Sequence, residues 1–140
     1  MKGYILLLLL AMTGGVAAAQ DAEEKLIRGV LARQELAWNE GNIDEFMECY
    51  WKSDSLKFIG TSITKGWKAT LERFHTTYPD RAAMGTLKFN LYGLTFISAE
   101  LCLVTGRYQL KRAKDEPTGM FTLLLRKIEG KWVIVYDHTS

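Results

Sequence analysis

From residue 87 onward this chain alternates apolar and polar residues, whereas the preceding part repeats apolar residues at helical spacing. The alternating segments are residues 87–96, 101–112, 119–128 and 131–139. Because only short turns separate them, we expect an antiparallel meander of strands. Gly93 shifts the phase of the first segment, which predicts a β-bulge that bends the sheet.

Three helices are predicted ahead of this sheet. The first is expected to begin at a capping box formed by Asp21 and Glu24 and to end at Gly41, which can adopt the left-handed conformation. Asn42 is a suitable N-cap for a short second helix. A third helix is expected over residues 66–77, because Pro79 follows and excludes further helical turns.

Two short extended segments are expected between the second and third helices, over residues 56–60 and 62–64. Three N-terminal helices packed on a strongly curved antiparallel sheet define an α+β domain. Such a sheet encloses a cone, and the mouth of the cone is a natural pocket for a small molecule.

Residues 1–19 have the layout of a secretory signal peptide: Lys2, an apolar run over residues 4–12, and small residues before Gln20. We expect cleavage before Gln20, so that the mature domain is residues 20–140 and lies in the periplasm or is secreted. The alternative is a retained membrane anchor, but the apolar run is shorter than the roughly 20 residues that span a bilayer. After cleavage we expect no contact with a membrane.

Composition narrows the remaining classes. The chain of 140 residues is long enough for one domain, and a net charge of +2 gives no basic field for nucleic acid. His75 and His138 are far apart and no Cys/His pair has zinc-site spacing, so we expect no metal. No phosphate-binding glycine motif is present, so we expect no cofactor. Cys49 and Cys102 are left open between a disulfide formed after export and two free thiols.

A series of short motifs runs along residues 21–140. They are Gln34-x-x-Ala37-Trp38-Asn39-x-Gly41-Asn42-Ile43, Phe46-Met47, Tyr50-Trp51, Gly66-Trp67, Tyr78-Pro79, Met84-Gly85, Gly106-Arg107, Phe121-Thr122-Leu123 and Trp132-x-Ile134-Val135-x-Asp137-His138-Thr139-Ser140. Together they resemble the SnoaL-like families of the nuclear transport factor two-like superfamily. The last motif also resembles the association domain of calcium/calmodulin-dependent protein kinases.

This resemblance implies a cone-shaped, cystatin-like α+β roll. The superfamily includes ketosteroid isomerase, scytalone dehydratase, limonene epoxide hydrolase, polyketide cyclases, and non-catalytic transport and oligomerisation domains. Resemblance in fold therefore does not choose between a catalytic and a non-catalytic role.

Asp137 and His138 are the candidate catalytic residues, because a carboxylate or an imidazole can act as a general acid or base near neutral pH. Neighbouring residues of a regular strand point to opposite faces, so only one of the two would face the cone. Asp137 shares the phase of Val135, and His138 shares that of Ile134 and Tyr136. The sequence leaves open which phase is interior.

Aromatic residues are the candidate ligand-binding group. Trp38, Tyr50, Trp67 and Tyr78 lie on or beside helical stripes, and the resemblance implies that such residues line the cone. By the same resemblance, the Tyr50 phenol would donate a hydrogen bond to a carbonyl oxygen. Arg107 lies in a strand and either binds an anionic group of a ligand or is exposed on the outer face.

Two functions follow from these observations. The first is an exported small-molecule-binding domain of the SnoaL-like type, which holds a hydrophobic or aromatic molecule and is a candidate cofactor-independent acid–base enzyme (isomerase, cyclase or hydrolase-like). The alternative is a non-catalytic homodimerisation or accessory module. In either case we expect a homodimer, because Leu101 and Leu103 alternate with Cys102 and Val104 and so make both faces of their strand apolar.

Overall fold

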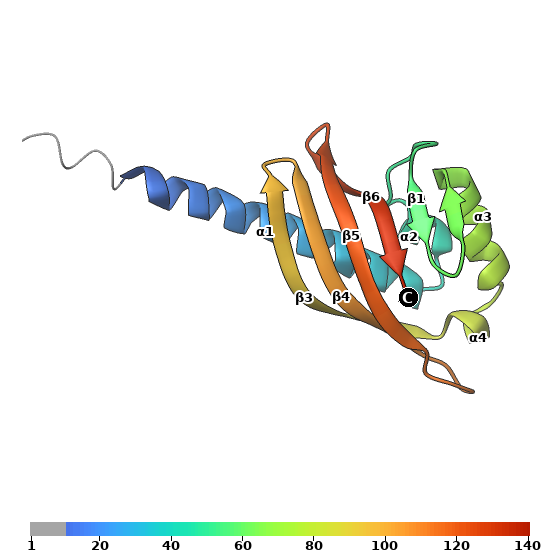
Figure 1. The fold of residues 1–140 in the computed structure, drawn as a ribbon. Helices are drawn as coiled ribbons and strands as arrows, with labels where there is room; N and C mark the ends of the chain where they lie inside the picture. Colours follow the sequence, from blue (N-terminus) through green and yellow to red (C-terminus); the bar gives the residue numbers. More distant parts are fainter. Residues whose placement is uncertain (1–10) are drawn as a thin grey trace, which may run out of the picture.

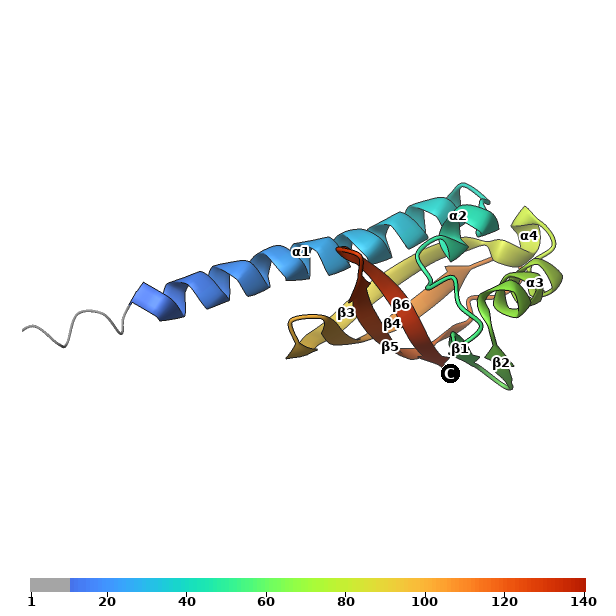
Figure 2. The ribbon, with the colours of Figure 1, turned by 90° about the horizontal axis from the view of Figure 1, so that it is seen from above.

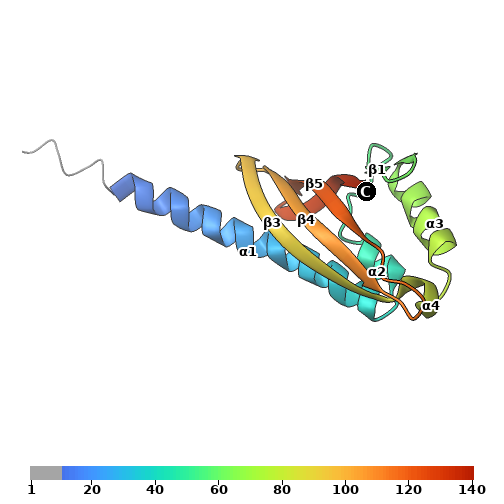
Figure 3. The same cartoon turned by 60° about the horizontal axis from the view of Figure 1, so that its bottom comes forward.

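The computed structural model describes residues 11–140 and confirms the predicted α+β class (Figure 1). Its elements are α1 (Ala11–Asn39), α2 (Ile43–Met47), β1 (Lys57–Ile59), β2 (Ile63–Lys65), α3 (Trp67–Thr77), α4 (Arg81–Met84), β3 (Thr86–Ser98), β4 (Leu101–Lys111), β5 (Thr118–Ile128) and β6 (Lys131–Thr139). Figure 2 shows α1 and α2 along one face of the curved sheet. Figure 3 shows α3 and α4 gathered at the end of the molecule opposite the start of α1.

The six strands form one sheet in the order β2-β1-β6-β5-β4-β3. Strands β3 to β6 are the predicted antiparallel meander. The register of β3 shifts between Leu91 and Gly93, so Tyr92 is the extra residue of a bulge beside the predicted glycine. The sequence did not predict that β1 pairs in parallel with β6, with Phe58 opposite Asp137. Periodicity identifies a strand but carries no information about a distant partner.

Helix α1 begins ten residues before the predicted capping box, at Ala11. The predicted start is wrong because alanines precede it, and alanine has the highest helix propensity, so the helix continues through Asp21. Glu24 instead pairs with Arg28 one turn later, at 2.8 Å. No helix within residues 11–140 has both the length and the apolar content needed to cross a membrane. Residues 1–10 of the predicted signal peptide lie outside the described residues.

The remaining helices are short and are defined by their caps. The Asn42 side chain accepts a hydrogen bond from the Glu45 backbone N–H at 3.0 Å, which confirms the predicted N-cap of α2. Helix α3 spans Trp67–Thr77, as predicted. Helix α4 was not predicted, although its N-cap Asp80 accepts from the Ala83 N–H at 2.8 Å. An aspartate directly after a proline was the available signal.

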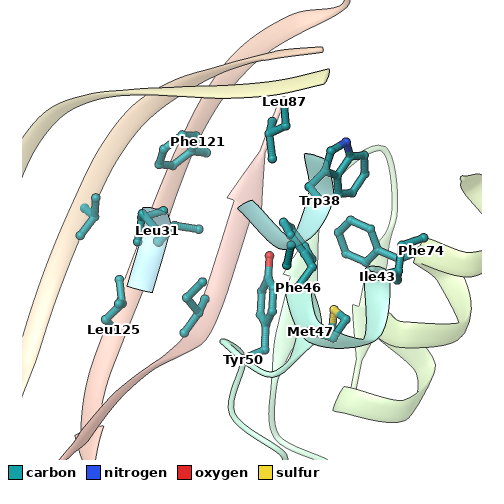
Figure 4. Close-up of a cluster of buried hydrophobic side chains, with 14 of the residues drawn as sticks. Leu31, Trp38, Ile43, Phe46, Met47, Tyr50, Phe74, Leu87, Phe121 and Leu125 are labelled. Carbon is teal, nitrogen blue, oxygen red and sulfur yellow. The ribbon is translucent and has the colours of Figure 1, made fainter. Parts of the chain in front are cut away.

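The core lies between α1 and the concave face of the sheet. The buried stripe of α1 includes Ile27, Leu31 and Trp38, and it meets inward-facing strand residues such as Leu125 (Figure 4). Cys49 and Cys102 are both buried and free, so the disulfide is not formed. Burial raises the pKa of the Cys49 thiol to about 11, which leaves it protonated at neutral pH.

Glu23 fastens the first part of α1 to the β5–β6 hairpin. Its carboxylate accepts hydrogen bonds from Lys127 Nζ and Trp132 Nε1, both at 2.6 Å. The bond from Lys127, followed by that from Trp132, lowers the pKa of the Glu23 carboxyl. The helix is therefore held to the sheet three residues after the expected cleavage position.

Candidate functional site

A cavity of about 110 Å³ lies between the helices and the concave face of the sheet. Its walls are mostly aromatic and aliphatic, with contributions from α1, α2, α3 and the strands; they include Trp38, Phe46, Phe58, Phe74, Tyr78, Leu87, Phe89, Tyr108, Leu110, Phe121 and Leu123. In a protein interior a dry apolar cavity of about 150 Å³ takes up benzene, so this volume suits a molecule near one ring in size. In Figure 4 the Tyr50 hydroxyl points into this group of side chains.

The cavity adjoins an opening of about 200 Å³ at the surface. The two spaces share Phe58, Phe74, Tyr78, Tyr108 and Thr139 as lining residues. The opening at the surface therefore lies next to the interior cavity.

Asp137 is the buried carboxyl of the cavity wall, with 4% of its surface exposed. Its two oxygens accept hydrogen bonds from the Tyr50 hydroxyl and the Thr139 hydroxyl, each at 2.6 Å. Burial raises the pKa of Asp137 to about 6, against the opposing effects of Thr139, Tyr50 and the charge of His138. Both protonation states of Asp137 are therefore accessible near neutral pH.

A second bulge explains why Asp137 faces inward. In the pairing of β5 with β6, Leu125 lies opposite Ile134 and Leu124 lies opposite Tyr136, so Val135 is an extra residue. The bulge separates two pairings of β6, one with the segment at Tyr50 and the other with β1. Ile134 and Asp137 consequently both point inward although they are three residues apart. No glycine marks this bulge, so the sequence carried no signal for it.

Tyr50 follows α2 and is 3% exposed. Burial, followed by the charge of Asp137, raises the pKa of the Tyr50 phenol well above its ordinary value. The phenol is therefore neutral at physiological pH and donates its proton to the hydrogen bond with Asp137.

Gln34 and Thr139 are cavity residues that the sequence did not identify as site residues. Gln34 is 1% exposed and lies on the buried stripe of α1. Among the residues that the structure describes, its Nε2 atom has no hydrogen-bond partner. The available signal was a glutamine at a position of the helix where apolar residues are expected.

The structure brings Trp38, Tyr50, Tyr78 and Asp137 together around the cavity. The Trp38 indole also has a structural role, because Nε1 donates to the Met84 carbonyl at 3.1 Å.

Three candidate site residues do not line the cavity, an outcome that the sequence had left open for Arg107 and His138. Trp67 donates from Nε1 to the Met47 carbonyl at 2.9 Å and so joins α3 to α2. Arg107 and His138 are exposed, because the strand alternation and the Val135 bulge direct them to the outer face. Within residues 11–140 no three His, Cys, Asp or Glu side chains are placed to hold a metal ion.

A helix-covered, curled sheet around an apolar cavity defines the nuclear transport factor two-like class, which has a cystatin-like fold. The family model for the SnoaL-like domain matches residues 27–140, and the chain belongs to this family. This confirms the resemblance seen in the motifs. No curated protein matches the chain.

Solved structures agree with this assignment. An NTF-2-like protein of unknown function from Shewanella oneidensis MR-1 is 41% identical, with a TM-score of 0.82, over 84% of this chain and 98% of that chain. A cystatin-like domain of unknown function from Nostoc punctiforme is 18% identical, with a TM-score of 0.71, over 85% and 76%. A putative calcium/calmodulin-dependent protein kinase type II association domain from Thiobacillus denitrificans is 14% identical, with a TM-score of 0.70, over 81% and 92%. The last two similarities concern the fold alone.

Proposed function

We propose that this chain is an exported domain that binds a small hydrophobic or aromatic molecule in the cavity beside Asp137. The observation that carries the proposal is a cavity with aromatic walls and a single buried carboxyl at a polar end. Apolar walls favour ligand binding through the hydrophobic effect, and a few polar groups orient the ligand.

The polar end also supports cofactor-independent acid–base chemistry as part of this proposal. A carboxylate has about four acceptor positions, so Asp137 retains capacity for a ligand proton while it accepts from Tyr50 and Thr139. With a pKa of about 6, it can both take and return a proton near neutral pH. Because His138 lies on the outer face, we assign the proton transfer to Asp137 alone. Isomerisation, cyclisation and hydrolysis are the reaction classes that use such a group.

Filling the cavity is expected to abolish binding. Leu123 lines the cavity, so Leu123→Phe places extra ring volume inside it. Met120 lies on the same strand, is exposed and does not line the cavity, so Met120→Phe is the control. In an NMR titration with ethylbenzene, we expect wild type and Met120→Phe to bind equally and Leu123→Phe to bind at least about tenfold more weakly. The proposal is contradicted if neither wild type nor the control variant binds ethylbenzene, or if all three proteins bind it equally.

Export is supported by the exposure of the segment before the expected cleavage position. The side chains of residues 15–20 are exposed, and the first fully buried side chain of α1 is Ile27. Removal of residues 1–19 therefore leaves the core and the Glu23 contacts in place.

Homodimerisation through the outer face of the sheet is the second proposed function. Leu103, Leu124 and Tyr136 lie opposite one another across β4, β5 and β6, and Tyr136 is 37% exposed. A partly exposed apolar row of this kind is typical of an interaction surface, and a two-fold pair of identical chains is the commonest soluble assembly.

Native mass spectrometry of the protein exported by a bacterial host tests both proposals. We expect a subunit mass corresponding to residues 20–140 and a complex of two subunits. Leu103→Glu places a charge in the apolar row and is expected to give mainly single subunits, whereas Ile63→Glu, on strand β2 at the edge of the sheet, leaves the pair intact. An uncleaved subunit contradicts export, and a single wild-type subunit contradicts the dimer.

A further inference from the structure

The amide of Gln34 is a buried polar group that the fold itself does not use. Gln34 lies on α1, is 1% exposed and lines the cavity. A side-chain interaction of its amide with the Tyr50 phenol lowers the pKa of that group, in opposition to burial. This contact does not reach hydrogen-bond geometry, and Nε2 has no hydrogen-bond partner among the residues that the structure describes.

A buried donor without a partner is costly, so its presence in a core requires an explanation. A leucine or methionine of similar volume would fill the same position without that cost. The apolar neighbours of Gln34 in the stripe, Leu31 and Trp38, show that the position suits an apolar residue. A ligand that accepts a hydrogen bond in the cavity accounts for the glutamine.

The other polar groups restrict what this ligand can be. The hydroxyls of Tyr50 and Thr139 already donate to Asp137, so Gln34 Nε2 is the fully buried side-chain donor that is left for a ligand among the described residues beside Asp137. An anionic ligand would be brought close to the Asp137 carboxylate in a medium of low dielectric, which is unfavourable. A carbonyl oxygen accepts hydrogen bonds and brings no donor that needs a partner of its own.

We propose that Gln34 Nε2 donates a hydrogen bond to the carbonyl oxygen of a neutral, one-ring ligand and thereby selects carbonyl compounds over hydrocarbons of the same size. This inference rests on the proposed binding function. The aromatic walls hold the ring, and the polar end formed by Gln34, Tyr50 and Asp137 holds the oxygen.

The test compares acetophenone with ethylbenzene, which differ in the carbonyl group and have similar shapes. The ratio of the ethylbenzene Kd to the acetophenone Kd is measured by NMR titration for wild type, Gln34→Leu and Gln34→Met. We expect both substitutions to lower this ratio about five- to tenfold, the size of one neutral hydrogen bond. The infrared carbonyl stretch of bound acetophenone is expected at a lower frequency in wild type than in either variant. Two variants are used so that a folding defect in one of them, detected by thermal unfolding, does not decide the result.

The outcomes separate this inference from the function on which it rests. If ethylbenzene and acetophenone both bind and the ratio is the same in wild type and variants, the role of Gln34 is refuted and the binding function stands. If neither compound binds to wild type, both proposals fail. If benzoate at pH 8 binds as tightly as acetophenone, selection for neutral ligands is refuted.

Discussion

Replacing Trp38 with alanine is expected to lower the free energy of unfolding by about 3–5 kcal/mol, the usual cost of removing a buried tryptophan. Trp38 is 3% exposed, and its ring lies 5.2 Å from Phe46, 6.1 Å from Phe74 and 4.7 Å from Tyr78 between centroids. The substitution also leaves the Met84 carbonyl without its indole donor. Urea denaturation followed by circular dichroism measures the loss.

Trp67→Ala is the matched control, because Trp67 is also a tryptophan that donates to a backbone carbonyl. Trp67 is only half-buried and packs at the margin of the core, so we expect a loss of about 1–2 kcal/mol. Equal losses for the two variants would show that Trp38 has no special place in the core.

Replacing Asp137 with asparagine is expected to remove a decrease of about 2 kcal/mol in the free energy of unfolding between pH 4 and pH 6. Burial raises the pKa of Asp137 from 3.8 to about 6 in the folded protein. The folded state therefore binds this proton more tightly than the unfolded state. Protonation stabilises the fold at low pH, and the stabilisation is lost as pH rises through about 6.

The difference between the two proteins isolates this effect. Glu23 and Asp115 have lowered pKa values, caused first by hydrogen bonds from Lys127 and Arg112, and they contribute the opposite slope equally to both proteins. At pH 7.5 the Asn variant is expected to be the more stable protein, since it does not bury a charge.

Asp115→Asn is the control for Asp137→Asn. Asp115 is an exposed carboxyl whose pKa is lowered in the folded protein. Its charge gives a small stabilisation that is present above this pKa and is lost at lower pH. At pH 7.5 the Asp115→Asn substitution therefore lowers the free energy of unfolding slightly, whereas Asp137→Asn raises it. Parallel stability curves for wild type and Asp137→Asn from pH 4 to pH 7.5 would contradict a raised pKa at Asp137.

The local elements of this fold could be predicted because their signals are local. The N-cap at Asn42, the end of α3 before Pro79 and the bulge beside Gly93 each follow from the conformational preference of a single residue. The start of α1 was wrong, because two local preferences competed: a capping box at Asp21 and a strong helix propensity before it.

The candidate site was only partly predictable. Helical spacing identified four aromatic residues as candidates for the wall of the cavity. Trp38, Tyr50 and Tyr78 line it, whereas Trp67 donates a hydrogen bond to α2 instead. Gln34 lies on the buried stripe of α1, but helical spacing reveals a buried face and not an unpartnered donor. That property depends on every neighbour of the side chain, and those neighbours come from distant segments.

By itself the sequence determined the order of helices and strands, the curved meander and the family, because the periods of apolar residues and the turn-forming residues act over a few positions. Tertiary structure alone decided that Asp137 and not His138 faces the cavity. One extra residue, Val135, reverses the alternation, and β6 accommodates it because two different segments pair on either side of the bulge. The same packing brings the Tyr50 hydroxyl to Asp137 from 87 positions away, a contact that no local pattern encodes.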